Sequence, residues 1–244
     1  MSTMIKTPKN SIRNIALPML LVTALVGCNH DDDEPKVMPP MPEPEPMEYS
    51  YQVTMMNLTH SQPLSPITAV LHGDEKMWMV GSSASTPLEK LAEGGDNADF
   101  IAQDSIIASI ADSGVLLPGA SASITINTTD TSATHLSVAT MLVNTNDAFS
   151  GLTGLELSNL EVDQAMTWNL HVYDAGSEAN SELAGTIPGP ADGGIGFDAV
   201  RDDIDVVTLH AGVVSQDDGL TTSVLTQAHR FDNPAIKLTI TRLK

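Results

Sequence analysis

Cysteine, aromatic residues and basic residues are all scarce in this chain of 244 residues. There is one cysteine, Cys28, and if it is lipidated, as argued below, no thiol remains for a disulfide or for cysteine catalysis. Aromatic residues make up 4% of the chain, which argues against stacking platforms for bases or sugars. There are 11 basic and 31 acidic residues, and the resulting net charge of −20 disfavours nucleic acid and anionic membrane surfaces as partners. Such a charge suits a soluble surface exposed to divalent cations.

Catalytic motifs are also absent. The sequence has no G-x-S-x-G elbow, no H-E-x-x-H helix, no phosphate loop and no dinucleotide glycine motif. Six histidines beyond residue 50 are scattered, at positions 60, 72, 135, 171, 210 and 229, without the spacing of metal ligands. We therefore predict a protein that is not an enzyme.

No apolar run is long enough to span a membrane. The longest, Ile15–Val26, has twelve residues and follows three basic residues, which is typical of a signal peptide. It ends in Leu-Val-Gly-Cys, which resembles the bacterial lipobox, so residues 1–27 are predicted to be removed and Cys28 to be lipidated. The alternative is an ordinary signal peptide with a chance cysteine. Asn29, by analogy with enteric lipoproteins, favours the outer membrane, so we expect a lipid-anchored cell-envelope protein that is periplasmic or surface-exposed.

Residues 28–49 have the composition of a tether. An acidic run at 31–34 is followed by six prolines up to position 46. Proline at this density holds an extended, semi-rigid chain that cannot pack a core. The acidic run is interpreted as part of a solvated spacer rather than as a calcium trap.

From residue 50 onward, short apolar runs of period two dominate. Each run predicts a half-buried strand, and together they predict one all-β domain over 50–244, mainly an antiparallel β-sandwich. The alternating apolar residues are Tyr51, Val53 and Met55; Ala122, Ile124 and Ile126; Trp168, Leu170 and Val172; and Ile236, Leu238 and Ile240.

Residues 86–111 interrupt the strand pattern. Thr86, Pro87 and Glu89 combine an N-cap, a proline at the first helical position and a capping-box glutamate, and Gly94-Gly95 supplies a stop. A second helical stretch is expected over 98–111. We predict a short helical insertion that caps one end of the sandwich and is held by apolar packing alone.

Two acidic turns follow two strand-like runs. Leu136–Val143 leads into Asn144–Gly151, and Met166–Tyr173 leads into the turn that ends at Asn180. Paired strands bring their loops together, so Asp147, Asp174 and Glu178 are expected to converge. Carboxylates gathered in this way repel each other unless a hard cation lies between them, and Ca²⁺ takes six to eight oxygen ligands. The alternative is a pair of ordinary solvated acidic turns. Asn144, Asn146 and Asn180 are weaker ligand candidates.

These turns also carry a family resemblance. The segments MLVNTNDAFSGL, YDAGSEAN and IPGP, with YQVTMMNLTHSQPLSP, LAEGGDN and NPAIKLTITRL, resemble the spondin N-terminal (F-spondin) domain family in its bacterial lipoprotein form. The likeness runs over about 50–244. It implies a calcium-binding antiparallel sandwich similar to C2 domains, with Asp147, Asp174 and Glu178 as calcium ligands. At the last position animal members more often have Asp. Those members act in matrix and cell adhesion and carry disulfides that this chain lacks, so their partners are not implied.

Two further features lie near the C-terminus. Residues 193–198 match one copy of a calcium-binding β-roll repeat, but that fold needs several stacked copies, so we interpret the match as chance or as a loop near the site. Asp202, Asp203 and Asp205 form a second acidic cluster. It is interpreted as a solvated loop, with a weak second cation site as the alternative.

The combined interpretation is a lipid-anchored extracytoplasmic domain that binds Ca²⁺ through Asp147, Asp174 and Glu178. Its expected role is an adhesion or binding module for an unknown protein or glycan of the envelope or matrix, with membrane contact only through the lipid on Cys28. Two alternatives remain: a purely structural envelope lipoprotein, and a calcium-dependent hydrolase. The hydrolase would require a second catalytic group near Asp147 and a concave pocket.

Overall fold

The computed structural model describes residue 43 and residues 45–244, and Glu45–Lys244 form one compact unit. The predicted signal peptide, Cys28 and most of the tether lie outside the described residues. Within the described part, residues 45–48 are extended and exposed before the first strand begins at Tyr49. None of the helices in residues 45–244 has the length and apolar character needed to cross a membrane.

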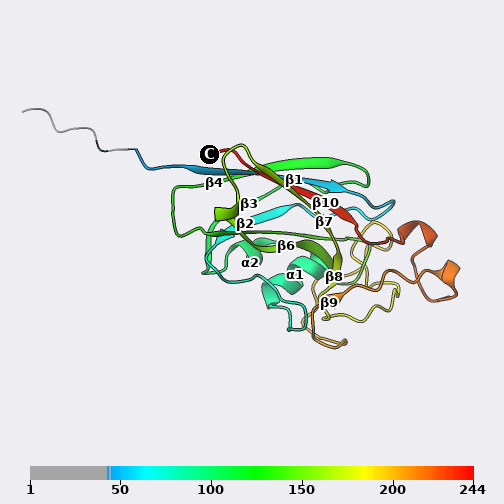
Figure 1. The fold of residues 1–244 in the computed structure, drawn as a ribbon. Helices are drawn as coiled ribbons and strands as arrows, with labels where there is room; N and C mark the ends of the chain where they lie inside the picture. The colour runs from blue at the N-terminus through cyan, green and yellow to red at the C-terminus, as the bar shows by residue number, and fades with distance from the viewer. Residues whose placement is uncertain (1–42, 44) are drawn as a thin grey trace, which may run out of the picture. The chain divides into compact units, whose positions relative to one another are not determined.

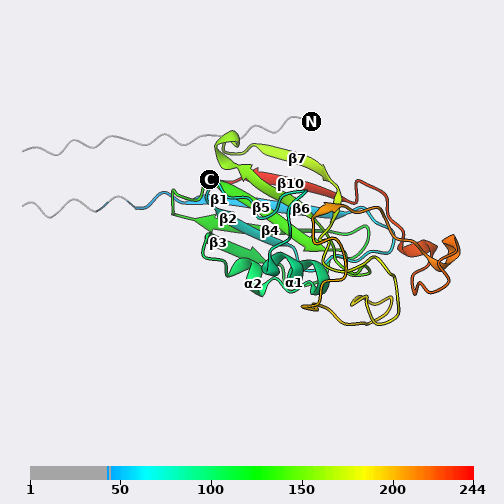
Figure 2. The same cartoon turned by 90° about the horizontal axis from the view of Figure 1, so that it is seen from below.

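Two antiparallel sheets face each other, as predicted for a β-sandwich (Figures 1 and 2). The four-stranded sheet has the order β4 (Ser121–Thr128), β1 (Tyr49–Asn57), β10 (Ile236–Arg242) and β7 (Ala165–Leu170). The six-stranded sheet has the order β3 (Ile106–Ala111), β2 (Thr68–His72), β5 (His135–Met141), β6 (Ala148–Glu156), β8 (Val172–Asp174) and β9 (Thr208–Leu209).

The predicted period-two residues form the core between the sheets. Val53 of β1 pairs with Ile240 of β10 and with Ile124 of β4, and all three side chains are buried. They pack in one cluster with Leu71 of β2 and Leu136 of β5 from the other sheet. Because successive strand residues point to opposite faces, the polar residues between them face outward.

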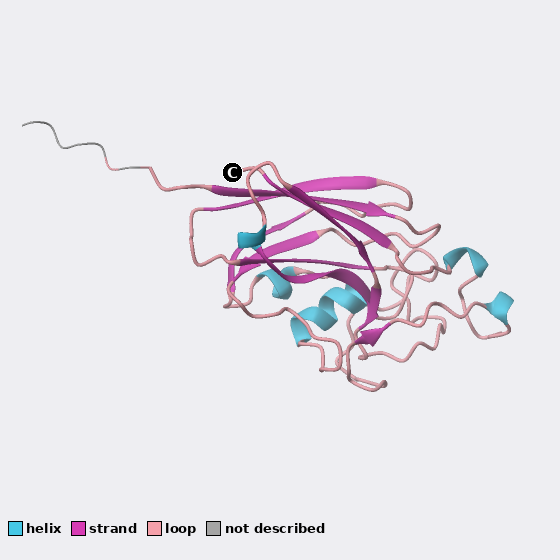
Figure 3. Cartoon of the chain, in the orientation of Figure 1, coloured by secondary structure: helices cyan, strands magenta, loops and turns pink. Residues whose placement is uncertain are grey.

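The helices cover the outer face of the six-stranded sheet, which corrects the prediction that they cap one end (Figures 2 and 3). α1 (Thr86–Gly94) buries Leu88 and Leu91 in a second apolar cluster that includes Val70 of β2 and Phe149 of β6. Val70 and Leu71 of β2 point to opposite faces of the six-stranded sheet, and both are buried. The sheet is therefore covered on both faces.

The capping-box assignment and the second helix also need correction. Ser85, not Thr86, is the N-cap of α1, and its side chain accepts from the Leu88 N–H. α2 (Ala98–Ile101) stops after one turn, and residues 106–111 form the edge strand β3, which pairs with β2. The β-branched isoleucines at 106, 107 and 110 favour an extended chain where a sheet edge is available for pairing.

The single strand expected over 166–173 is two strands in two sheets. β7 ends at Leu170, and after His171 the chain continues as β8, which pairs with β6 in the opposite sheet. The alternation of Trp168, Leu170 and Val172 continues across this break, because all three side chains still face the same core. This change of sheet carries the Asp174 turn to the edge where β6 begins.

The chain from Ala175 to Ala235 is mostly irregular (Figure 3). Apart from β9, its described elements are the short 3-10 helices η2 (Gln216–Asp218) and η3 (Gln227–His229); a third, η1 (Leu157–Asn159), follows β6. A small apolar cluster of Ile187, Val213 and Leu225 anchors this region. These loops lie at the same end of the sandwich as the Asp147 turn.

Gly151 provides a test of the β5–β6 pairing. A Cβ at this position would lie 2.0 Å from the Val138 carbonyl oxygen and 2.9 Å from the Trp78 ring. Overpacking of this kind costs about 1–3 kcal/mol or more, and here the first obstacle is backbone. We expect Gly151→Ala to lower the free energy of unfolding by at least that amount in urea denaturation of residues 29–244.

Gly73→Ala is the matched control, because a Cβ there meets no atom within 4 Å. Equal stability of the two alanine variants would contradict the close packing described for β5 and β6.

Candidate metal centre

The pairing of β6 with β8 brings the two predicted acidic turns together. Ala148, the first residue of β6, pairs with Asp174, the last residue of β8. The backbone N–H of Ala175 donates to the carbonyl oxygen of Asp147 at 3.2 Å. The expected convergence of Asp147 and Asp174 is therefore present in the fold.

Asp147 is fully buried, with 0% of its surface exposed. Its Oδ2 accepts from the Ser177 N–H at 2.9 Å, the Ser177 hydroxyl at 3.2 Å and the Glu178 N–H at 3.1 Å. Its Oδ1 is also buried and has no hydrogen-bond partner within the described residues. A buried carboxylate oxygen without a partner costs free energy, so this atom is where a further ligand would gain most.

Asp174 shapes the turn that approaches Asp147. Its Oδ1 accepts from the Gly176 N–H at 2.8 Å, and its Oδ2 accepts from the Asn180 side-chain amide. Gly176 has φ +75, and a Cβ there would lie 2.5 Å from the Val206 carbonyl oxygen. The turn therefore requires glycine, both for its left-handed backbone and for the close approach of Val206.

The electrostatics confirm that the carboxylates are crowded. Burial raises the pKa of Asp147 to about 7, and repulsion from Asp174 adds to the rise, against the opposing effect of the Glu178 and Ser177 donors. Burial raises the pKa of Glu178 to about 8, followed by repulsion from Glu93, Asp147, Asp202 and Asp198. Four acidic side chains therefore raise the pKa of Glu178 by repulsion.

Glu93 is a member of this group that the sequence prediction missed. It lies on α1, is 1% exposed, and accepts from the Asp198 N–H at 2.8 Å through Oε2, while its Oε1 is buried without a partner. Burial raises its pKa. The sequence did hold a signal: Glu89 and Glu93 lie next to the apolar residues Leu88, Leu91 and Ala92 on a short helix, which places them near its buried side. Acidic residues are rarely buried without a partner, so this position indicates that each has one.

The three asparagines named as weaker candidates have different surroundings. Asn144 uses its side chain structurally, donating to the Ser61 carbonyl and accepting from the Ala191 N–H. Asn180 holds Asp174. Asn146 donates to Thr186 but leaves its buried Oδ1 without a partner, so it alone presents a spare oxygen.

The loop after residue 185 carries further acidic residues to the site. Asp198 and Asp202 line a pocket of about 160 Å³ together with Glu178 and Asn146. Asp205 instead pairs with Arg201, which also forms an ion pair with the buried Glu89. The segment 193–198 has no regular secondary structure. α1 is therefore held by an ion pair with this loop as well as by apolar packing on the sheet, which corrects the prediction that apolar packing alone holds it.

The donor set fits a hard cation. All candidate ligands are oxygens, and Asp147 Oδ1 and Asn146 Oδ1 are buried without partners. In the part of the chain that the structure describes, however, no three Asp, Glu, His or Cys side chains already stand together as a metal-binding group. Binding would therefore require the partly exposed Glu178 to move toward Asp147, with waters and backbone carbonyls completing the shell.

Comparison with known proteins identifies the family. The family model described as Spondin_N matches residues 54–185, which is more than half of the chain. The chain belongs to the spondin N-terminal domain family. It matches none of the curated proteins with which it was compared.

The family assignment bears directly on the site. Asp147, Asp174, Glu178 and Glu93 all lie within the part matched to the spondin domain, whereas Asp198 and Asp202 lie beyond it. The spondin N-terminal domain is an extracellular, non-catalytic binding module.

The raised pKa values predict a pH dependence of stability without divalent cations. The folded state holds protons on Asp147 up to about pH 7 and on Glu178 up to about pH 8, whereas the unfolded chain releases them near pH 4. Because the folded state binds more protons, stability falls as pH rises from about 4 through about 8. In urea denaturation with EDTA, we expect Asp147→Asn to reduce this slope.

Part of the slope will remain in that variant, because burial also raises the pKa of Glu182 to about 7. Asp104→Asn, which changes an exposed carboxylate, serves as the control. A slope that is the same in Asp147→Asn as in the wild type would contradict the burial of an uncompensated Asp147 charge.

Proposed function

We propose that this chain is a lipid-anchored, extracytoplasmic calcium-binding domain. Its acidic loops would present a binding face to a protein or glycan of the cell envelope or matrix. The observation that carries the proposal is the Asp147 carboxylate, which is fully buried with one oxygen unpartnered and two acidic residues close by.

Asp147, Asp174 and Glu178 would hold the ion. Asp147 Oδ2 is fixed by the backbone of residues 177 and 178, which leaves Oδ1 free for the ion. Asp174 sets the Gly176 turn and would turn one oxygen inward in exchange for its bond to Asn180. Glu178, the longest of the three, reaches over from the turn that it shares with Asp174. When bound, Ca²⁺ neutralises the charge that otherwise forces these carboxylates apart.

The expected binding face lies beside the ion. Asp202 N–H donates to the Ser177 carbonyl and Asp205 N–H donates to the Gly176 carbonyl, so the 200–205 segment packs on the ligand turn. This segment exposes the apolar side chains of Val200 and Ile204. Exposed apolar side chains next to a charged rim are typical of interaction sites. Calcium would fix the turn on which this segment rests.

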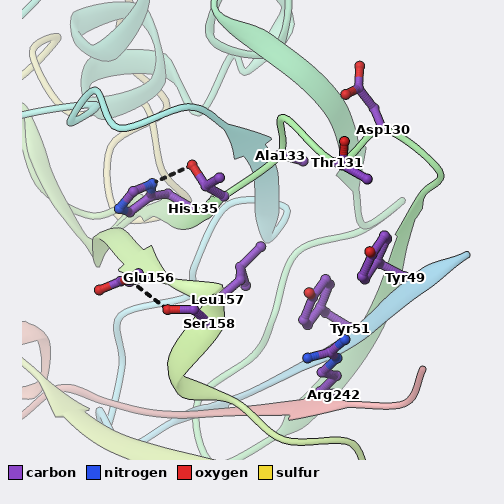
Figure 4. Close-up of a pocket in the computed structure, with 11 residues that line it drawn as sticks. Tyr49, Tyr51, Asp130, Thr131, Ala133, His135, Glu156, Leu157, Ser158 and Arg242 are labelled. Atoms are coloured by element: carbon purple, nitrogen blue, oxygen red, sulfur yellow. Dashed lines mark hydrogen bonds between the residues drawn. The ribbon is translucent and has the colours of Figure 1, made fainter. Parts of the chain in front are cut away.

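The alternative calcium-dependent hydrolase has less support. The pocket beside Glu178 is lined by carboxylates and contains no histidine. A cavity of about 410 Å³ that contains His135 and Glu156 lies at the opposite end of β6 (Figure 4). In that cavity Tyr49, Tyr51 and Arg242 face His135 and Glu156 across the opening (Figure 4). Since β6 spans nine residues, the two ends lie about 26 Å apart, too far for shared catalysis.

Calcium binding is tested by thermal unfolding of residues 29–244 with Ca²⁺, Mg²⁺ or EDTA. A ligand that binds only the folded state adds about 2.7 kcal/mol at a hundredfold excess over Kd. We expect a calcium-specific rise in the unfolding midpoint that Asp174→Asn loses. Asp112→Asn, which lies directly after β3 at the opposite edge of the six-stranded sheet from β8 and β9, should keep the rise. An absence of calcium response in the wild type would refute the metal site.

Lipid anchoring is tested separately in bacterial cells by metabolic labelling with a fatty acid. We expect label on the wild-type chain and none on Cys28→Ser, which should leave the membrane fraction, since each buried CH₂ of a lipid contributes about 0.8 kcal/mol to anchoring. Asn29→Asp should keep the label. Label that persists in Cys28→Ser would show that this cysteine is not the lipidation site.

A further inference from the structure

The pocket beside Glu178 has the features of a second ligand site. It holds about 160 Å³ and is lined by six side chains that bear oxygen: Asn146, Glu178, Ser181, Thr186, Asp198 and Asp202. No lysine or arginine contributes to its walls. Arg201, the arginine in the same loop, is engaged by Glu89 and Asp205. Residues 45–244 therefore supply no lysine or arginine to the lining of this pocket.

Asn146, which lines the pocket, has a hydrogen-bond acceptor without a partner. The side chain is 2% exposed, and its Nδ2 donates to the Thr186 hydroxyl at 2.8 Å and to the Thr186 carbonyl at 3.3 Å. These bonds fix which end of the amide is the oxygen. That oxygen, Oδ1, is buried and unpartnered among the described residues. A buried amide oxygen without a donor marks the place of a missing partner.

The acidic residues of the pocket each keep an oxygen available. Asp202 Oδ1 accepts from the Ala179 N–H at 2.7 Å, and Asp198 Oδ1 accepts from the Val200 N–H at 2.9 Å. Within residues 45–244 their Oδ2 atoms and the Glu178 carboxylate make no hydrogen bond. Three carboxylates thus border one small space, and each has an oxygen without a hydrogen-bond partner among the described residues.

The backbone positions of Asp198 and Asp202 are fixed by buried groups. The Asp198 N–H donates to Glu93 Oε2, and the Asp202 N–H donates to the Ser177 carbonyl at 3.2 Å. A Cβ at Gly94 would lie 3.4 Å from the Phe197 nitrogen, so the loop passes close to the end of α1. The pocket wall is therefore held by the helix and by the ligand turn.

We propose that this pocket binds a second hard divalent cation, with Asn146 Oδ1 and the carboxylates of Glu178, Asp198 and Asp202 as ligands. The all-oxygen donor set, the negative charge and the small volume suit Ca²⁺ with several bound waters. Asp198 and Asp202 are exposed, and their side chains would rotate inward around the ion.

The second ion is distinct from the first. Asp147 and Asp174 belong to the first site alone, Asn146, Asp198 and Asp202 belong to the second alone, and Glu178 lies between them. The two loop aspartates lie outside residues 54–185, whereas Asn146 and Glu178 lie within them, so this site joins the matched segment to the loop beyond it. Its existence does not require the first ion.

The test counts Ca²⁺ ions bound per chain by equilibrium dialysis and isothermal titration with residues 29–244. We expect two ions for the wild type, one for the double variant Asp198→Asn with Asp202→Asn, and one for Asp147→Asn. Asn146→Ala should weaken the affinity for the second ion at least tenfold. Asp203→Asn, an exposed acid of the same loop outside the pocket, should retain two. Unfolding midpoints in EDTA check that each variant is folded.

The outcomes separate the two sites. One ion in the wild type that Asp147→Asn removes and the double variant retains would overturn the second site and leave the first intact. One ion that only the double variant removes would support the second site and refute the first. Two ions in the double variant would overturn the second site.

Discussion

The burial of one carboxylate, Asp147, is the constraint around which this end of the sandwich is arranged. β6 and β8 pair directly after it, so it has no route to solvent. Three donors from residues 177 and 178 satisfy one oxygen only. These donors favour the charged form of Asp147, but burial and repulsion from Asp174 outweigh them, so its pKa is raised to about 7.

The change of sheet at His171 determines which residues meet Asp147. Had β7 continued straight, Asp174 would have extended the four-stranded sheet, away from β6. The Val172 N–H instead donates to the Asn233 side chain, and the Val172 carbonyl accepts from the His210 N–H. These contacts seat β8 between β6 and the C-terminal region. The acidic turn is therefore positioned by segments about forty to sixty residues further along the chain.

That dependence explains what the sequence could predict. Period-two alternation found β1, β4, β7 and β10, because burial of alternate side chains leaves a local pattern. It could not separate β7 from β8, since Leu170 and Val172 both face the core. Residues 106–111 were expected to be helical because Ile106, Ile107 and Ile110 have mixed helical spacing, and only pairing with β2 decides. The convergence of the Asp147 and Asp174 turns could be predicted, because each turn follows a recognisable strand-like run. Glu93 was not linked to them, because it lies on a helix 54 positions before Asp147 in sequence. The loop 193–198, which contains Asp198, was placed near the site as one of two alternatives.

The family match ends at residue 185, and the chain before and after this point contributes different parts of the structure. The matched family segment supplies five strands of the six-stranded sheet and the buried acidic residues around Asp147, whereas β10, an inner strand of the other sheet, lies beyond it. The loop beyond it contributes Asp198, Asp202 and the exposed Val200, seated on α1 through Glu93 and through the Glu89–Arg201 ion pair. Buried charge on a helix is costly unless it is paired, so Glu89 and Glu93 stabilise the fold only while the loop is docked. The docking of this loop and the position of α1 are therefore coupled, because Arg201 and the Asp198 N–H supply the partners of Glu89 and Glu93.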